Sequence, residues 1–426
     1  MKNTIIKLFN LEPHQLHSVD VFSIGDESFA LITLSRVPQV CPFCSSMTNR
    51  VHDYHQRTLN HAILNGLTTT LVYSARRYYC DHCKRSFPEP DPFSLPGKRL
   101  SRFTILRIMQ ELKNPRLTFS TVAQSCSVSD TTVRRVFDSY VGLVSHKLPE
   151  VLCIDEVYTA KHNRRCFACV LLDFNTSQIY DLLPKRNKAF LANYFTLIPE
   201  EDRKRVKFVC MDMWEPYRDV CKLYFKNAMI VVDNFHVVKL ISSAFNRTRV
   251  RVMKQFDKDS DEYYLLKKYN WLLNRKYTSF DSGQRIKLKK KLKSFYSSDP
   301  LIDEVINFML ASDFELEVAY TLKEDFNDLN TLSNSSIEES LDSFIDELTL
   351  YNLSDFSNVV KTMKNWRQEI INSFTLYNGR RVSNGPVESC NARIKLLKHN
   401  ANGYTNFERF RKRVLYSLNK DSFINF

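Results

Sequence analysis

Two Cys-x-x-Cys pairs, Cys41-Pro-Phe-Cys44 and Cys80-Asp-His-Cys83, constrain the fold of this chain more than any other feature. Each pair forms a tight turn that aims two thiolates at one ion, and two such turns complete a tetrahedral site, which zinc favours. The long separation between the pairs leaves room for two strands, residues 51–61 and 68–80. The spacing therefore predicts a structural zinc ion that closes a strand hairpin.

The other candidate ligands in the chain are weaker. His52 and His55 lie between the two pairs and are rival zinc ligands, although four cysteines are the simpler set. Cys166-x-x-Cys169 repeats the spacing, but it lies in a strand-like run where the two side chains point to opposite faces, so we interpret it as core. The chain has 11 cysteines, an odd number scattered through apparent strands, which predicts free thiols and no disulfide framework.

The charge is unevenly spread along the 426 residues, a length that predicts two to four domains. Residues 299–347 hold 14 acids and one lysine, which leaves 60 basic residues against 33 acids elsewhere. Such a basic remainder indicates a polyanionic partner. We expect no membrane span, because no run of about 18 apolar residues occurs. The N-terminal apolar stretch is too short for a signal peptide, so we expect a cytoplasmic protein.

A proline-rich stretch, residues 87–99, predicts a domain boundary, and three helices follow at about 101–112, 117–126 and 129–146. Ser101 and Ser129 are the expected N-caps. The last two helices predict a helix-turn-helix with an apolar inner face (Ala123, Val128, Val133 and Val136) and an outward polar face (Thr131, Thr132, Arg134 and Arg135). A plain helical hairpin is the alternative.

From residue 149 the chain reads as three strands, helix, strand, helix, strand and helix, which is the order of a ribonuclease H-like fold. Residues 251–375 lack strand-like runs and predict a helical insertion. Asp155 and Asp212 stand at the ends of strands that neighbour each other in this fold, and Glu388 stands near the start of a late helix that returns to them. Asp233 and His236 are expected beside the same edge in a supporting role.

Three carboxylates in this arrangement suit phosphodiester chemistry. Hard cations such as Mg²⁺ prefer carboxylate oxygens, and two ions can serve both the attacking and the leaving oxygen. Individually these acids are more often turn or cap residues, and Glu156 is a further acid in the same strand. Their order on these elements is the reason to predict a metal-dependent nucleic-acid enzyme.

Several stretches resemble the L-three group of bacterial insertion-sequence transposases, which are DDE transposases. They are CPFC, RRYYCDHCKRSF, IDE, MDMWEPYRDV, VVDNFHVVK and SNGPVESCNARIKLLKHNANGYTNFERFRKRVLY. The resemblance implies an N-terminal zinc ribbon, a helix-turn-helix and a ribonuclease H-like core interrupted by helices. It implies Asp155, Asp212 and Glu388 as a catalytic triad that holds two Mg²⁺ (or Mn²⁺) ions, and one structural Zn²⁺.

The expected architecture is multidomain α+β. The predicted parts are N-terminal strands and zinc ribbon (1–97), helix-turn-helix DNA-binding domain (98–148), ribonuclease H-like core, first part (149–250), helical insertion (251–375) and last helices of the core (376–426). The expected DNA contacts are Arg134, Arg135, Arg393, Lys395 and Lys398.

The implied function is metal-dependent cleavage and transfer of DNA strands after binding to the terminal inverted repeats of the element. The partners are double-stranded DNA and a second copy of the chain, in a nucleoid-associated cytoplasmic protein. Trp214 is expected either to stack on a base or to anchor the core. The alternatives are a non-catalytic DNA-binding regulator on a decayed core, disfavoured because all three acids are present, and a structure-directed nuclease, which would not need two modules that read DNA sequence.

Overall fold

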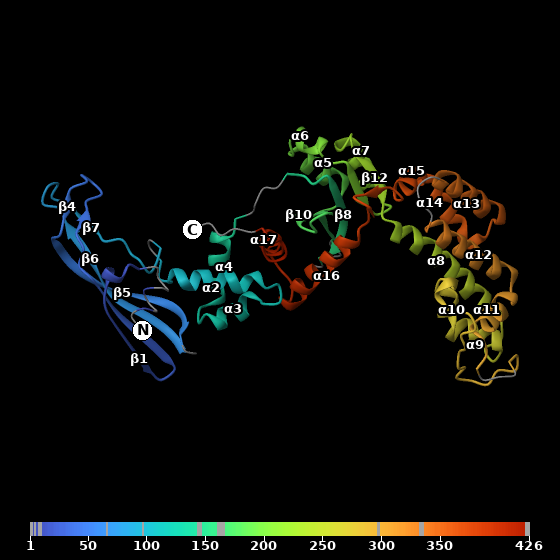
Figure 1. Cartoon of the computed structure of the whole chain (residues 1–426), viewed down its shortest axis with the longest axis horizontal. Helices are drawn as coiled ribbons and strands as arrows, with labels where there is room; N and C mark the ends of the chain where they lie inside the picture. The colour runs from blue at the N-terminus through green and yellow to red at the C-terminus, as the bar shows by residue number, and fades with distance from the viewer. Residues whose placement is uncertain are drawn as a thin grey trace. The chain divides into compact units, whose positions relative to one another are not determined.

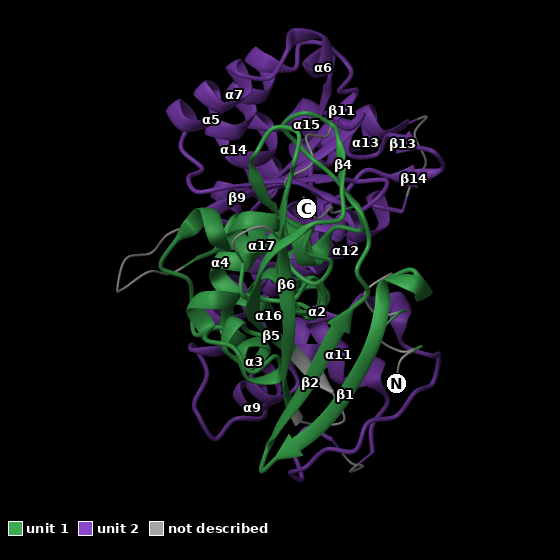
Figure 2. Ribbon diagram, turned by 90° about the vertical axis from the view of Figure 1, so that its left-hand side faces the viewer, with its two compact units in different colours: residues 1–145, 158–166, 391–426 green, residues 146–157, 167–390 purple. Residues whose placement is uncertain are grey.

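The computed structural model describes residues 3, 6, 11–64, 67–95, 98–142, 147–159, 167–295, 299–331 and 336–421. The chain divides into two units (Figure 2): unit 1 comprises residues 1–145, 158–166 and 391–426, and unit 2 comprises residues 146–157 and 167–390. The observed architecture is mixed α/β, with a cysteine cluster in the N-terminal part of unit 1.

Unit 1 begins with an extended sheet of order β1-β2-β6-β5, with β7 paired to β6 (Figure 1). Its strands are β1 (Leu16–Ile24), β2 (Glu27–Leu34), β5 (Val51–Leu64), β6 (Leu67–Tyr79) and β7 (Ser86–Pro88). The β5–β6 hairpin is the pair of strands predicted between the cysteine pairs, and it is confirmed. One face packs around Leu59 and Leu71, which are fully buried because inward side chains alternate along each strand. Phe93, from the segment after β7, is fully buried in the same core.

Three helices follow the sheet: α2 (Arg102–Lys113), α3 (Phe119–Ser125) and α4 (Asp130–Tyr140). The predicted caps are confirmed, since the side chains of Ser101 and Ser129 accept hydrogen bonds from backbone amides in the first turn. The turn between α3 and α4 passes through Ser127 at a φ of 52°. Helix α4 ends earlier than predicted, at Tyr140, and residues 143–146 of the predicted helix lie outside the described residues.

The C-terminal helix α17 (Phe407–Leu418) packs on α2 and α4. Tyr416 Oη donates a hydrogen bond to the Met109 carbonyl (2.8 Å), and the guanidinium of Arg409 lies 2.6 Å from a carboxylate oxygen of Asp138. Arg413 of α17 is fully buried, and its guanidinium donates to the Asn114 and Leu117 carbonyls (3.0 and 2.9 Å). The sequence predicted that residues 376–426 belong with the core, and that grouping stays a prediction. The contacts of α17 given above lie within unit 1.

Unit 2 contains a five-stranded sheet of order β10-β9-β8-β11-β12. Its strands are β8 (Val151–Tyr158), β9 (Phe167–Asp173), β10 (Ile179–Leu183), β11 (Phe208–Met211) and β12 (Met229–Val232). Its helices are α5 (Lys188–Thr196), α6 (Glu200–Lys204), α7 (Glu215–Tyr224) and α8 (Asn234–Met253). The predicted order of elements is confirmed, with α6 as an addition. Cys169 is fully buried on β9, and Cys166 lies outside the described residues.

Residues 280–295 of the predicted insertion (251–375) form turns and irregular structure, but most of its described part folds into helices, as predicted. These helices are α9 (Asp261–Lys268), α10 (Asn270–Asn274), α11 (Ile302–Ala311), α12 (Phe314–Leu329), α13 (Ile337–Tyr351), α14 (Ser357–Asn365) and α15 (Arg367–Asn372). One hydrophobic core joins them to the sheet, including Leu152 and Val209 of the strands and Ile306 and Leu322 of the insertion. Among the described helices, none combines the length and apolar character that crossing a membrane requires.

After the insertion, a short β13 (Leu376–Tyr377) and β14 (Arg380–Arg381) pair leads into α16 (Gly385–Asn400). Helix α16 belongs to unit 2 up to Cys390 and to unit 1 from Asn391 onward. It places Glu388 in its first turn, as predicted, and its basic residues further along.

Candidate zinc ribbon and candidate catalytic site

The two cysteine turns share one backbone geometry. In the first, the Cys41 amide donates to the Ser46 carbonyl and the Ser45 amide donates to the Cys41 carbonyl, both at 2.9 Å. In the second, the Lys84 amide donates to the Cys80 carbonyl at 2.9 Å. Ser45 and Lys84 both adopt a left-handed φ, 61° and 56°. This repeated turn brings the two thiols of each pair to the same side.

The four sulfur atoms form a compact cluster. Cys41 Sγ lies 3.6 Å from Cys83 Sγ, and Cys44 Sγ lies 3.6 Å from Cys80 Sγ. All four lie within 4.8 Å of one another. A tetrahedral site with Zn–S bonds of about 2.3 Å has sulfur atoms about 3.8 Å apart, so the cluster fits one zinc ion.

The pKa values of two thiols in this cluster shift in opposite directions. A backbone amide at Ser46 lowers the pKa of Cys44 to about 5, whereas burial raises the pKa of Cys83 to about 12. Thiolates that share a small site cannot all ionise without a cation. The rival ligands point elsewhere: the ring nitrogens of His52 and His55 lie 3.1 and 3.2 Å from the carboxylate of Asp53.

In unit 2, the parallel strands β8, β11 and β12 bring acids to one edge of the sheet. Asp212 directly follows β11 and Asp233 directly follows β12, as predicted. Asp155 lies inside β8 and not at its end, which corrects the prediction. However, β11 pairs with β8 only as far as Cys153, so Asp155 lies beyond the last paired residue. The edge is therefore the same for all three acids.

These acids interact electrostatically. Burial, and then the charge of Asp212, raises the pKa of Asp155 to about 7. His236 Nε2 lies 3.0 Å from Asp212 Oδ1 and 4.0 Å from Asp233 Oδ2, and the hydrogen bond to Asp212 raises the pKa of His236. Burial, opposed by a backbone hydrogen bond from Asn384, raises the pKa of Asp233. Asp155, Asp233 and His236 therefore each hold a proton more strongly than the free side chain does.

Glu388 reaches this group through a link that sequence reasoning missed. Asn384 is buried directly before α16, and its side-chain Nδ2 donates to the Ile154 carbonyl of β8 (3.1 Å). Its backbone amide donates to Asp233 Oδ1 (3.3 Å), and its carbonyl accepts from the Glu388 amide (3.0 Å). The charge of Glu388 also raises the pKa of Asp233. The only sequence signal is an asparagine just before Gly-Pro at a helix start.

The donor set suits a divalent cation. Ligand atoms of Asp212, Asp233 and His236 lie within 4.8 Å of one another, and Asp155 and Glu388 interact electrostatically with members of this group. Carboxylate oxygens suit Mg²⁺ and Mn²⁺, whereas an imidazole suits them less. The chemistry therefore favours the carboxylates as ligands, with His236 holding Asp212.

Two further residues of this region have other partners. Glu156 forms an ion pair with Arg186. The Arg186 guanidinium lies 4.7 Å from the Trp214 ring centroid, and Trp214 packs edge-on against Tyr217 at 4.6 Å. These contacts match the core-anchor alternative for Trp214, and Glu156 serves to fix Arg186.

The predicted DNA contacts lie in unit 1 and differ in their pairing. Arg134 forms an ion pair with Asp130 of the same helix (2.8 Å), whereas Arg135 is exposed on the next position of α4. The side chains of Arg393 and Lys395 are exposed on α16. Lys398 is half-buried, and its Nζ lies 5.3 Å from the Tyr158 ring centroid.

Comparison with known proteins gives two family matches and one relative. A family model for ISL3-type DDE transposases, described as "Transposase", matches residues 152–414. A second model, for the zinc-finger of transposase IS204/IS1001/IS1096/IS1165, matches residues 38–83. The transposase for insertion sequence element IS1001 of Bordetella parapertussis is 25% identical over 276 residues, or 60% of this chain. The match spans 63% of that relative's length.

Proposed function

The chain belongs to the ISL3 family of transposases, and on that premise we propose that it is a DDE transposase acting on the ends of an insertion sequence. It binds the terminal inverted repeats, cleaves DNA strands beside them and transfers the ends to a target. The observation that carries the proposal is the shared sheet edge of Asp155, Asp212 and Asp233, to which Asn384 attaches the helix that bears Glu388.

The proposal includes two finer assignments of fold. In sequence order the sheet of unit 2 reads third, second, first, fourth and fifth strand, which supports a ribonuclease H-like core interrupted by the helical insertion. The short turn between α3 and α4, with the caps at Thr118 and Ser129, supports a helix-turn-helix. The zinc ribbon stands before it, with one structural Zn²⁺ on the four clustered cysteines.

In the proposed reaction, Asp155, Asp212 and Glu388 would hold two Mg²⁺ or Mn²⁺ ions. The ions would lower the pKa of a bound water and offset charge at the phosphate. His236 keeps Asp212 oriented through their 3.0 Å contact. Asp233 fixes the start of α16 by accepting the Asn384 amide, which holds Glu388 in place. Supporting contacts of this kind orient ligands and are commonly needed for full activity.

The partners follow from the same reaction. The zinc ribbon and the helix-turn-helix hold the inverted repeats, and the basic side chains on α4 and α16 contact phosphates. These are Arg135, Arg393, Lys395 and Lys398, whereas Arg134, also predicted as a contact, is paired with Asp130. Both ends of an element must be processed together, so we propose at least a homodimer on DNA, associated with the nucleoid.

The test is divalent-ion-dependent cleavage of a labelled duplex that carries the ends of the element encoding this chain. Wild type should nick at the element boundary, and Glu388→Gln should bind the duplex without cutting it. Glu338→Gln is the matched control, because Glu338 also lies in the first turn of a helix but is exposed on α13. The control should cut at the wild-type rate.

A non-catalytic DNA-binding regulator on a decayed core remains the second candidate. The presence of all three acids and their attachment to one sheet edge weigh against it. If wild type and Glu388→Gln both bind and neither cuts with Mg²⁺ or Mn²⁺, the regulator becomes the better description.

A further inference from the structure

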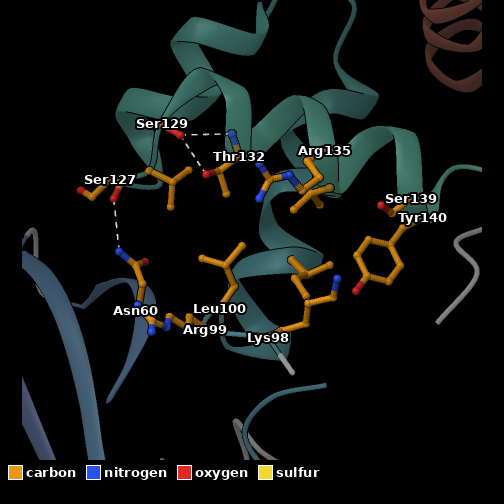
Figure 3. Close-up of a pocket in the computed structure, with 13 residues that line it drawn as sticks. Asn60, Lys98, Arg99, Leu100, Ser127, Ser129, Thr132, Arg135, Ser139 and Tyr140 are labelled. Carbon is orange, nitrogen blue, oxygen red and sulfur yellow. Dashed lines mark hydrogen bonds between the residues drawn. The ribbon is translucent and has the colours of Figure 1, made fainter. Parts of the chain in front are cut away.

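Unit 1 contains a cleft of about 600 Å³ beside α4. We call it the α4 cleft and define it by Lys98, Arg99, Leu100, Arg135, Ser139 and Tyr140. Figure 3 shows the side chains of α4 along one side and those of the 98–100 segment along the other, both facing a common space. The floor is apolar, formed by Leu100, Ile105, Val128 and Val136. The volume is within the usual range of ligand sites.

The rim of the α4 cleft is strongly basic. Lys98, Arg99 and Arg135 are exposed, and their side-chain nitrogens form no ion pair or hydrogen bond with any residue that the structure describes. No acid occurs among the described residues that line the cleft. Three unneutralised cations around one hollow attract an anionic ligand, because no protein carboxylate competes for them.

The neighbouring face of α4, about 100° around the helix at Arg134, is different. Arg134 is paired with Asp130 at 2.8 Å, and Asp138 is paired with Arg409 of α17 at 2.6 Å. These carboxylates neutralise the cations beside them and would repel a phosphate. Helix α4 therefore has one face on which the charged side chains form ion pairs and another on which Arg135 forms none. The face with Arg135 borders the cleft.

The walls of the α4 cleft are held in place by the fold. Asn60 of β5 exchanges backbone hydrogen bonds with the linker, its amide donating to the Arg99 carbonyl and its carbonyl accepting from the Ser101 amide, both at 2.9 Å. Asn60 Nδ2 also donates to the Ser127 carbonyl in the turn before α4 (3.3 Å; Figure 3). The sheet, the linker and α4 are thus joined, and the cations on both rims are positioned relative to one another.

We propose that the α4 cleft binds one strand of DNA. Its phosphates lie between Arg135 on one rim and Lys98 and Arg99 on the other, and its deoxyribose rests on the apolar floor. DNA is the ligand whose chemistry fits, because it supplies evenly spaced anions along a partly apolar backbone. The inference deepens the proposed function by assigning DNA contact to the Arg135 face of α4 and not to the Arg134 face.

The test compares two neighbouring arginines of one helix. Arg135→Ala and the matched control Arg134→Ala are titrated with the element-end duplex over a range of salt concentrations, without divalent ions. Arg135→Ala should weaken binding about tenfold and reduce the slope of log affinity against log salt by about one. The double variant Lys98→Ala with Arg99→Ala should reduce the slope by about two, and Arg134→Ala should change affinity less than about twofold.

Neutral methylphosphonate linkages, placed one at a time along the duplex, locate the contact. At the contacted phosphate the substitution should weaken wild type but not Arg135→Ala. The cleft assignment is refuted if Arg134→Ala and Arg135→Ala lose equal affinity, or if Arg135→Ala leaves the salt slope unchanged. It is also refuted if wild type does not bind DNA. Cleavage is scored separately. A wild type that binds through Arg135 but never cuts refutes the transposase alone, and one that cuts while Arg135→Ala binds normally refutes the cleft alone.

Discussion

Replacing Asn384 by alanine should uncouple Glu388 from the sheet. The change removes the 3.1 Å hydrogen bond from Nδ2 to the buried Ile154 carbonyl. Losing a buried donor from such a pair costs about 1–3 kcal/mol of folding free energy. The backbone amide still reaches Asp233, but the start of α16 loses its attachment to β8. A displacement of about 1 Å at a reacting centre lowers the rate about 10²-fold, so we expect cleavage to fall by that order.

The assay measures single-turnover cleavage of the element-end duplex, end binding and urea unfolding for each variant. Asn384→Ala should lose cleavage while binding stays unchanged. Asn372→Ala is the matched control, because Asn372 Nδ2 donates to the Ile230 carbonyl (2.8 Å), near the start of β12 and away from the acids. It should cost about 0.5–1.5 kcal/mol and leave cleavage intact. Cleavage by Asn384→Ala within about twofold of wild type would refute the positioning role, as would an equal loss in Asn372→Ala.

Two further outcomes are expected. Replacing Cys41 and Cys44 by serine should leave less than one zinc ion per chain in a metallochromic assay. The variant should also bind the element ends more weakly, because a structural metal contributes directly to folding. A folded variant that keeps one zinc ion would contradict the four-cysteine site. Burial lowers the pKa of His61 to about 4 in the folded chain, from about 6.5 in the unfolded chain. Below about pH 6.5, the unfolded chain therefore binds a proton at His61 that the folded chain does not bind. The free energy of unfolding should therefore fall by about 2 kcal/mol between pH 7.5 and pH 5, and His61→Gln should lack this loss; a parallel pH profile in the variant would count against it.

Features set by local spacing were predictable from the sequence. The Cys-x-x-Cys turns, the caps at Ser101 and Ser129, and the order of strands and helices depend on neighbouring residues, and the structure shows them where expected. Asp212 and Asp233 were placed correctly because each directly follows a short apolar strand. The catalytic roles of Asp155, Asp212 and Glu388 stay predictions, although their positions on these elements are now defined.

Long-range packing decided what the sequence could not show. Asn384 matters because of contacts with β8 and Asp233, which lie more than 150 residues earlier in the chain. The predicted strand end at Asp155 was wrong because β8 continues past its pairing with β11. Arg134 and Arg135 look equivalent in sequence, and only the folded helix shows one paired with Asp130 and the other facing a cleft. Sequence patterns record which groups are near in the chain, whereas a site depends on which groups the folded backbone brings together.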